Sequence, residues 1–329
     1  MIVVLASEQS ASGARTKRSR SGEEHLADIQ RRRIISAVVK VVDAYDVEGA
    51  SIARIVAHAG VSRKTFYGVF DNRNDCVLAA IERALTLAAQ RARPAVEAQE
   101  RWVDRVRVGL LALLQWCDDE PQLARLCVLH SATAGPRTLA RRCEVLEGLA
   151  HVVDEGRKAA RRPPPPPLTA EGLVNGAFGT IHARLLKVDT GTLTDLLNPL
   201  MSFIVLPYLG AAAARRELRR PLPAAPVGRR LNSSPEALEA VNIRLTYRTV
   251  RVLAAIAAQP GLSNAQASEL AGVADQGQIS KLLGRLARLE YVENKGEGQR
   301  RGGANAWYLT PRGKQLERTV GRELPGVGP

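Results

Sequence analysis

Apolar positions recur at steps of three and four residues over most of the chain. The spacing is regular in residues 29–48, 71–92, 169–188 and 192–213. It places apolar side chains on one face of a helix, whereas a strand would show alternation by twos, and no such alternation interrupts residues 96–212. The pattern therefore predicts a mainly α-helical chain over its first two-thirds.

The last quarter of the chain shows a different order of elements. Helical spacing returns there, but a glycine-rich, basic stretch flanked by two short strand-like runs separates the third helix from the fourth. We predict helices over residues 242–260, 263–272, 275–292 and 311–324, with two short strands inside 293–310. The order is that of a small helical domain with a β wing.

Composition sets the domain boundaries. Residues 1–25 are rich in Ser, Gly and basic residues without periodicity, which is typical of disorder. RRPPPPP (161–167) is a stiff connector, because proline lacks the N–H group that a helix requires. The Arg/Pro-rich stretch near residue 220 predicts an extended linker. The predicted segments are 1–25, 26–75, 76–213, 214–235 and 236–324.

The formal net charge of +14 is distributed unevenly. Basic excess flanks the helical middle, where charges balance apart from the six arginines in 215–230. Nucleic acid is the simplest partner for such a chain. No apolar run reaches the eighteen residues of a membrane span, and the run near the start is too short for a signal peptide. We expect a cytoplasmic, nucleoid-associated protein with no membrane partner.

Candidate enzymatic chemistry is sparse. Cys76, Cys117, Cys127 and Cys143 form no C-x-x-C pair and lie in apolar contexts, so we expect buried thiols rather than a metal or redox site. The histidines share no catalytic pattern with a Ser or Cys, and the sequence contains no phosphate-binding loop or nucleophile elbow. We expect no cofactor, no metal and no enzymatic activity.

Two stretches of the chain repeat one motif. AHAGVSRKTFYGVF (57–70) and LAGVADQGQISKLL (270–283) both place Ala-Gly-Val before a short helix. In a helix-turn-helix the chain reverses through a left-handed backbone conformation that favours glycine, and an apolar residue follows to seal the two helices together. Gly60 and Gly272 are the predicted turn glycines, so the chain carries two candidate DNA-reading units.

The helix after each turn carries the candidate DNA contacts. Each begins with a capping residue, Ser62 or Asp275, and polar residues at its start would enter the major groove. Arg and Lys suit guanine or phosphate, and Gln suits adenine. Later apolar residues face the domain core: Phe66 and Phe70 in the first unit, and Ile279, Leu282, Leu283 and Leu286 in the second. The predicted contacts are Ser62, Arg63, Lys64 and Thr65; Gln276, Gln278, Ser280, Lys281 and Arg285; and, at the wing tip, Arg300 and Arg301. Docking of a protein partner is the alternative role for the second unit.

SIARIVAHAGVSRKTFYGVFDNRND (51–75) resembles the DNA-binding domain of the tetracycline-repressor (TetR) family. The resemblance implies phosphate contacts by Tyr67 and Arg73. It departs from the family at Gly68 and Val69, where an aromatic residue and a phosphate-contacting His are usual, and a glycine inside the recognition helix would cost about 1 kcal/mol. Residues 273–317 are similar to winged helices of the multiple-antibiotic-resistance (MarR) type.

The TetR resemblance also implies an all-helical domain that binds a small effector and forms a homodimer through residues 169–188 and 192–213. The candidate lining of an apolar effector pocket is Trp102, Trp116, Leu126, His130, Phe178 and His182, for which core packing is the alternative. The candidate dimer interface is Phe178, Ile181, Leu197, Leu200 and Ile204.

The sequence thus predicts a DNA-binding transcriptional regulator. In its most specific form, the prediction is an effector-responsive repressor that binds a palindromic double-stranded DNA operator as a homodimer. The first alternative is an architectural protein that bridges duplexes without an effector. A small-molecule enzyme with vestigial DNA motifs is the second. Sequence preference separates the first two, because a regulator favours one site by orders of magnitude.

Overall fold

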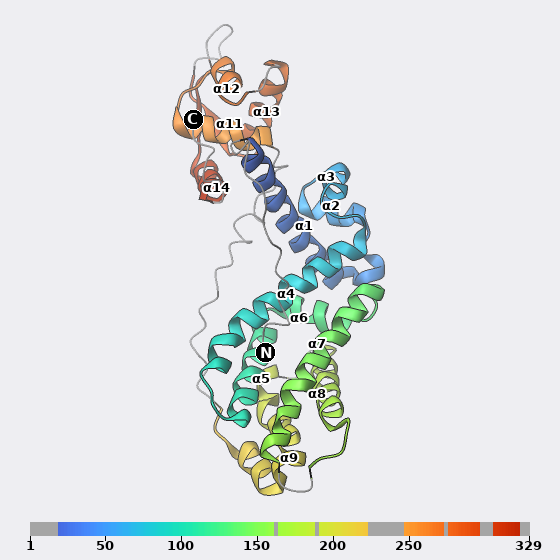
Figure 1. Ribbon diagram of the computed structural model, residues 1–329. Coiled ribbons are helices and arrows are strands. Elements are labelled where there is room, and N and C mark those ends of the chain that lie inside the picture. Colours follow the sequence, from blue (N-terminus) through green and yellow to red (C-terminus); the bar gives the residue numbers. More distant parts are fainter. Residues whose placement is uncertain are drawn as a thin grey trace. The chain divides into compact units, whose positions relative to one another are not determined.

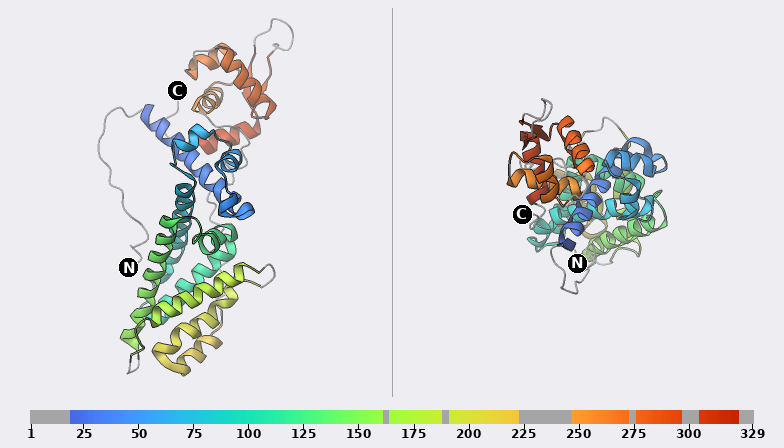
Figure 2. Two further views of the ribbon diagram at one scale, coloured as in Figure 1. Left: turned by 90° about the vertical axis from the view of Figure 1, so that its right-hand side faces the viewer. Right: turned by 90° about the horizontal axis from the view of Figure 1, so that it is seen from above.

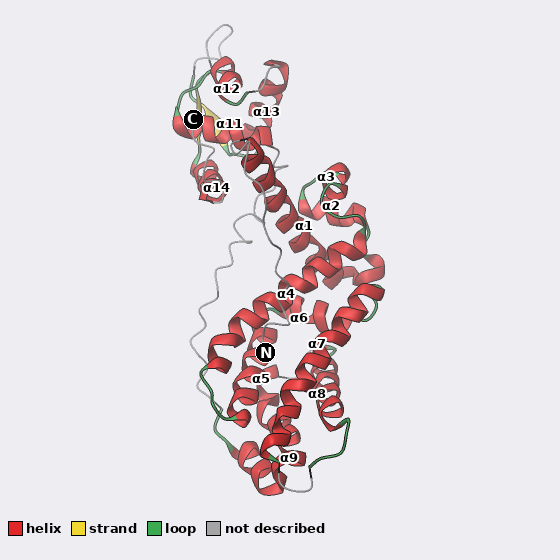
Figure 3. Ribbon diagram, in the orientation of Figure 1, coloured by secondary structure: helices red, strands yellow, loops and turns green. Residues whose placement is uncertain are grey.

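The computed structural model describes residues 19–160, 164–187, 191–222, 247–272, 276–296 and 305–322. Nearly all regular structure in these ranges is helical, as predicted, and the strands form one small sheet (Figures 1 and 3). The described residues fall into two compact units: residues 38–51 and 72–222 form the first, and residues 19–37, 52–71 and 247–322 the second.

The first four helices follow the predicted pattern with shifted ends. Helix α1 begins at Ser19, well before the first periodic apolar position. The short third helix ends at Tyr67, so that Gly68 is its C-cap rather than an interior residue, and the helix-propensity cost expected for that glycine does not arise. The elements are α1 (Ser19–Gly49), α2 (Ile52–Ala59), α3 (Arg63–Tyr67) and α4 (Arg73–Glu97).

The middle of the chain is a helical body, as its spacing predicts. Helices α4 and α5 pack along one another, as do α7 and α8 (Figure 2). The elements that follow α4 are α5 (Trp102–Asp119), α6 (Pro121–Arg125), the π-helical turn η2 (Leu126–His130), α7 (Pro136–Asp154), η3 (Glu155–Ala159), α8 (Thr169–Leu185), η4 (Leu193–Leu196) and α9 (Leu197–Arg219).

The last helix of the body, α9, bends in its second half. Pro207 removes a helical N–H donor, and Gly210 takes a left-handed φ of 77° that a side chain would disfavour. Residues 193–219 are long and apolar enough to cross a membrane by length and composition. Core helices pass the same test, and Leu197, Met201 and Tyr208 are buried in the core of the body.

The C-terminal residues show the predicted order of helices and strands. Strands β1 (Val292–Asn294) and β2 (Trp307–Leu309) pair antiparallel, with Glu293 opposite Tyr308. An isolated bridge joins Leu262 to Trp307, so the segment before α12 extends the sheet edge. The small sheet has the position of a wing after the third helix. The helices are α11 (Tyr247–Ala258), α12 (Asn264–Leu270), α13 (Gln276–Arg288) and α14 (Pro311–Arg322).

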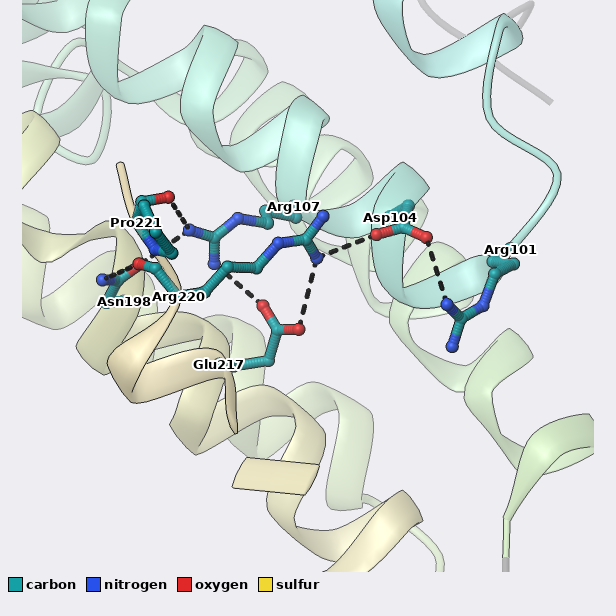
Figure 4. A network of polar contacts seen from close by, with 7 residues as sticks. All are labelled: Arg101, Asp104, Arg107, Asn198, Glu217, Arg220 and Pro221. Atoms are coloured by element: carbon teal, nitrogen blue, oxygen red, sulfur yellow. Dashed lines mark hydrogen bonds and ion pairs between the residues drawn. The ribbon is translucent and has the colours of Figure 1, made fainter. Parts of the chain in front are cut away.

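A buried ion pair ties the end of α9 to α5 (Figure 4). Arg107 Nη1 lies 2.8 Å from Glu217 Oε2, and the two side chains are only 4% and 9% exposed. Arg107 also donates to Asn198 Oδ1 at 2.7 Å, and Arg220 bridges Glu217 and Asp104 at the rim. A buried charge without its partner lowers the free energy of unfolding. The burial of Arg107 therefore depends on Glu217, and that of Glu217 on Arg107.

We predict that Arg107→Met lowers the free energy of unfolding by about 3–5 kcal/mol, because it leaves the buried Glu217 carboxylate with only the longer contact of 3.4 Å to Arg220 at the rim. The double variant Arg107→Met/Glu217→Met should lose much less, since neither charge then remains unpaired. Chemical denaturation measures both, with the exposed Arg101→Met as a control. Equal losses in the single and double variants would contradict the prediction.

Candidate nucleic-acid interface

The first helix-turn-helix turns at a left-handed glycine, as predicted. Gly60 has φ 61°, and the N–H of Val61 returns to the carbonyl of Val56 at 3.1 Å. The side chains of Phe66 and Phe70 are buried and pack against each other as a tilted pair, with their ring centroids 5.8 Å apart. These contacts fix α3 on its own domain and leave its opposite face available.

Ser62 caps α3, as its position predicts. Its Oγ accepts the backbone N–H of Thr65 at 2.9 Å and lies 2.8 Å from the Thr65 hydroxyl. Two of the predicted DNA contacts, Ser62 and Thr65, are therefore engaged in building the start of the helix. Such a cap contributes about 1 kcal/mol to helix stability.

Three of the predicted contacts on α3 face solvent. Arg63 and Lys64 are exposed, and Tyr67 has 56% of its surface exposed although it carries a large aromatic ring. Its edge contacts Phe66, which holds the ring in place at a centroid distance of 5.6 Å. The group offers two cations and a phenol hydroxyl, which are donors suited to base edges and phosphates.

Arg73, the last predicted contact of this unit, is half-buried at the start of α4. Its guanidinium donates to the carbonyl of Glu48 at 3.4 Å and to Asn74 Oδ1 at 3.3 Å. These long hydrogen bonds join the beginning of α4 to the end of α1. The proposed phosphate contact of Arg73 stays a prediction.

The second helix-turn-helix repeats this local structure. Gly272 has φ 62°, and the preceding α12 begins with a full capping box in which Ser263 and Gln266 satisfy each other's backbone N–H groups. Ile279, Leu283 and Leu286 of α13 are completely buried, as predicted, and Leu282 is partly buried. The predicted cap Asp275 lies outside the described residues.

Some of the predicted contacts on α13 form side-chain hydrogen bonds within the protein. Gln278 hydrogen-bonds Arg248 of α11, and Ser280 Oγ accepts from the amide of Asn264 at 2.9 Å. Lys281 and Arg285 are exposed. Arg300 and Arg301 lie outside the described residues, and nothing is described of the Gln276 side chain.

The sequence around the first helix-turn-helix matches a known family. Residues 34–80 match the family described as bacterial regulatory proteins, tetR family. The N-terminal helices are a tetR-family DNA-binding domain. The match confirms the resemblance for the N-terminal part of the chain. The exposed Arg63, Lys64 and Tyr67 lie on the third helix of this domain.

Solved structures of regulators resemble about half of the chain. FadR, a fatty acid degradation regulator from Bacillus halodurans, is 19% identical over 54% of this chain and 94% of its own, with a TM-score of 0.46. FadR from Bacillus subtilis, in complex with stearoyl-CoA, is 16% identical over 53% and 96%, also at 0.46. AibR, in complex with isovaleryl coenzyme A and operator DNA, is 13% identical over 54% and 100%, at 0.45. No curated protein matches the chain.

The candidate effector residues have different surroundings in the body. Trp102 donates its indole N–H to Val152 O at 3.0 Å and packs on Tyr208, and Phe178 lies under the Arg142 guanidinium at 4.6 Å. Leu126 is buried, and His182 is half-buried. Trp116 is buried, and its indole N–H has no hydrogen-bond partner among the described residues. The contacts of Trp102 and Phe178 favour core packing for these two residues.

The candidate dimer residues lie mostly inside one chain. Ile181, Leu197, Leu200 and Ile204 are each at most 5% exposed and belong to the core of the body. Phe178 is partly buried against the same core. An apolar periodicity marks the buried face of a helix without saying whether its own chain or a second copy buries it.

Ion pairs join α6 and α7 to the end of α1 and to the first half of α4, and no spacing in the sequence marks them. Arg125 donates two hydrogen bonds of 2.6 and 3.1 Å to the Asp43 carboxylate. They hold the pKa of that carboxyl below its usual value. Arg137 pairs with Asp75 and Arg141 with Glu82, each at 2.7 Å. His130 Nδ1 lies 3.9 Å from Asp46, and burial lowers the His130 pKa although Asp46 acts against the shift.

The cysteines are not equivalent. Burial raises the pKa of the Cys117 and Cys127 thiols to about 12, so both are held as neutral, unreactive thiols. Cys76 is buried as predicted, whereas Cys143 is exposed, because α7 presents it away from the core. The expectation of a buried thiol is wrong for Cys143.

We predict that Arg63→Ala weakens binding to the preferred operator by about 1–3 kcal/mol and relaxes the base preference at one position of each half-site. Fluorescence anisotropy with the operator and its single-base variants measures both effects. Arg101→Ala, which removes one exposed charge from the body, is the matched control. Unchanged binding by Arg63→Ala across all variants would mean that α3 does not read bases.

Proposed function

We propose that this protein is an effector-responsive transcriptional repressor that binds a palindromic operator as a homodimer. The observation that carries the proposal is the tetR-family domain, in which a capped and packed α3 presents Arg63, Lys64 and Tyr67 to solvent. Two such helices on a two-fold axis would read two half-sites of a palindrome. DNA is the partner that this set of exposed donors fits best.

The helical body is the proposed effector domain. Trp116 Nε1 and Ser131 Oγ are buried, and within the described part of the chain neither has a hydrogen-bond partner. A buried donor without an acceptor costs about 1–3 kcal/mol, so a ligand that supplies an acceptor oxygen would recover that cost. We propose a mostly apolar effector that carries such an oxygen.

Effector binding would reach the DNA-binding domain through the ends of α1 and α4. These helices precede and follow α2 and α3 in the chain, and the Arg125–Asp43, Arg137–Asp75 and Arg141–Glu82 pairs join them to α6 and α7. The π-helical turn η2 lies between α6 and α7, and such turns often occur at functional positions. A ligand that favours one arrangement of these elements would shift the balance between DNA-competent and DNA-incompetent states.

A second copy would pack on the exposed faces of α8 and α9. Phe203 and Leu206 are 45% and 47% exposed on α9. On α8, a Cβ atom added at Gly172 or Gly179 would meet nothing within 4 Å, and one at Gly176 would meet the Phe203 ring at 3.2 Å. The two helices thus share a surface of small residues beside the exposed side chains of Phe203 and Leu206, against which another pair of helices can approach closely.

We predict that Phe203→Asp or Leu206→Asp yields monomers that remain folded, because each would bury an unpaired charge in the dimer alone. Leu197→Asp should instead unfold each protomer, since that side chain is fully buried within one chain. Sedimentation velocity and circular dichroism separate the two effects, with Leu149→Asp on α7 as an exposed control. Intact dimers of both exposed-face variants would contradict this interface.

The C-terminal domain is proposed as a second DNA reader of the MarR-like winged-helix type. Its turn glycine and its buried α13 stripe repeat the local structure of the tetR-family unit, and Lys281 and Arg285 are exposed on α13. A protein-docking surface would more often expose an apolar patch than two cations at this position. The full-length protein should therefore cover more DNA than the tetR-type part alone.

We predict that Lys281→Ala/Arg285→Ala shortens the footprint of the full-length protein to that of a 1–222 truncation. It should also reduce the slope of log affinity against log salt by about one unit per lost phosphate contact. Lys314→Ala on α14 is the control for loss of one charge. Selection from a random DNA pool provides the operator, and the absence of any preferred sequence would favour the architectural, duplex-bridging alternative.

A further inference from the structure

The amide of Asn264 connects three elements of the C-terminal domain. Its Oδ1 accepts the indole N–H of Trp307 at 2.6 Å and the amide of Asn305 at 3.1 Å. Its Nδ2 donates to Ser280 Oγ at 2.9 Å. One side chain at the first position of α12 thus contacts the recognition helix α13, strand β2 and the residue two positions before Trp307.

The network continues to the base of the wing. Asn305 Oδ1 accepts from Asn294 Nδ2 at 2.7 Å. Asn294 Oδ1 in turn accepts the backbone N–H groups of Gly296 at 3.0 Å and Ala306 at 2.9 Å. A continuous chain of side-chain amides therefore runs from Ser280 on α13 to the backbone of both strands where the wing begins.

The donors and acceptors of this chain match in one arrangement. If the Asn264 amide were turned over, its NH₂ group would face the indole N–H of Trp307, and two donors cannot bond each other. A fully satisfied polar network fixes geometry more strictly than apolar packing, because sliding any member leaves a polar group unpaired. The network therefore holds strands β1 and β2, at the base of the wing, at one angle to α13.

We propose that Asn264 is the positioning residue that joins the wing to the recognition helix, so that both engage DNA as one rigid unit. In this assignment Ser280 serves the network and not a base edge, and contact with DNA on α13 falls to the exposed Lys281 and Arg285. The proposal rests on the second DNA-reading role proposed above, and it names the residue on which the mutual orientation of helix and wing depends.

Backbone hydrogen bonds tie the sheet to both neighbouring segments, and on the α13 side the N–H of Tyr291 donates to Leu286 O at 3.0 Å. The N–H of Gly261 donates to Trp307 O at 2.8 Å, and the N–H of Trp307 donates to Leu262 O at 3.0 Å, so β2 is anchored to the segment before α12. Those bonds fix the wing to α12. The hydrogen bond between Asn264 and Ser280 extends the same anchor to α13, the helix that carries the exposed cations.

The test is a double-mutant cycle in the full-length protein, on an operator long enough to fill the extended footprint. Asn264→Ala and Arg300→Ala/Arg301→Ala should each weaken binding, Asn264→Ala by about tenfold, which corresponds to about 1.4 kcal/mol. The variant that combines all three substitutions should lose little more binding affinity than the Arg300→Ala/Arg301→Ala variant alone, because Asn264 acts through the wing. Additive losses would overturn the proposal, since they would show that Asn264 acts independently of the wing.

Ser280→Ala provides a second variant whose exposed position makes misfolding no concern. It should weaken binding to the operator and to all its single-base variants by the same factor of about three, which corresponds to about 0.65 kcal/mol. A change in preference at one base pair would overturn the proposal by making Ser280 a base reader. An unchanged affinity would overturn it as well, because the network would then carry no positioning role.

The same set of measurements separates this proposal from the proposed second reader. If Lys281→Ala/Arg285→Ala leaves the footprint unchanged, the domain does not read DNA and the proposed function of this domain fails. If that variant shortens the footprint while Asn264→Ala binds like the unaltered protein, the second reader stands and the positioning role of Asn264 is overturned.

Discussion

The backbone reversal at two glycines is the constraint on which both candidate DNA readers depend. Gly60 and Gly272 adopt φ values of 61° and 62°, in a region where a Cβ atom is penalised. Each reversal turns the following helix so that its apolar stripe meets its own domain and its polar start faces outward. Without this reversal, α3 could not bury Phe66 while it exposes its cations. The same holds for α13 and Ile279.

Each reader uses its polar residues for two purposes, and this limits what the sequence can predict. Ser62 and Thr65 build the cap of α3, and Ser280 and Gln278 bond residues of other helices, whereas the cations nearby are exposed. Spacing shows that a residue lies on the polar face of a helix. It does not show whether a hydroxyl or amide finds its partner inside the domain, since partners such as Asn264 and Arg248 lie 16 and 30 residues away in the chain.

Local features of the fold were predictable, and long-range ones were not. The turn glycines, the Ser62 cap and the buried stripes follow from interactions within a few residues, and the structure confirms them. The pairs Arg107–Glu217 and Arg125–Asp43 join residues 110 and 82 positions apart, and no periodicity marks them. For the same reason, the apolar positions Leu197 and Leu200 marked a buried face but not the chain that buries it.

The pairing of charges in the body explains why the middle of a strongly basic chain is nearly neutral. Arginines at 105, 107, 125 and 141 each face a carboxylate within 2.8 Å, so their charges form ion pairs that hold helices together. On α3 and α13, by contrast, Arg63, Lys64, Lys281 and Arg285 are exposed. A cation that is already paired contributes little to attraction of a polyanion, whereas an exposed one releases counterions on contact with phosphate. The chain therefore uses similar residues in two settings: paired with carboxylates in the body, and exposed to solvent on the two helices that follow the turn glycines.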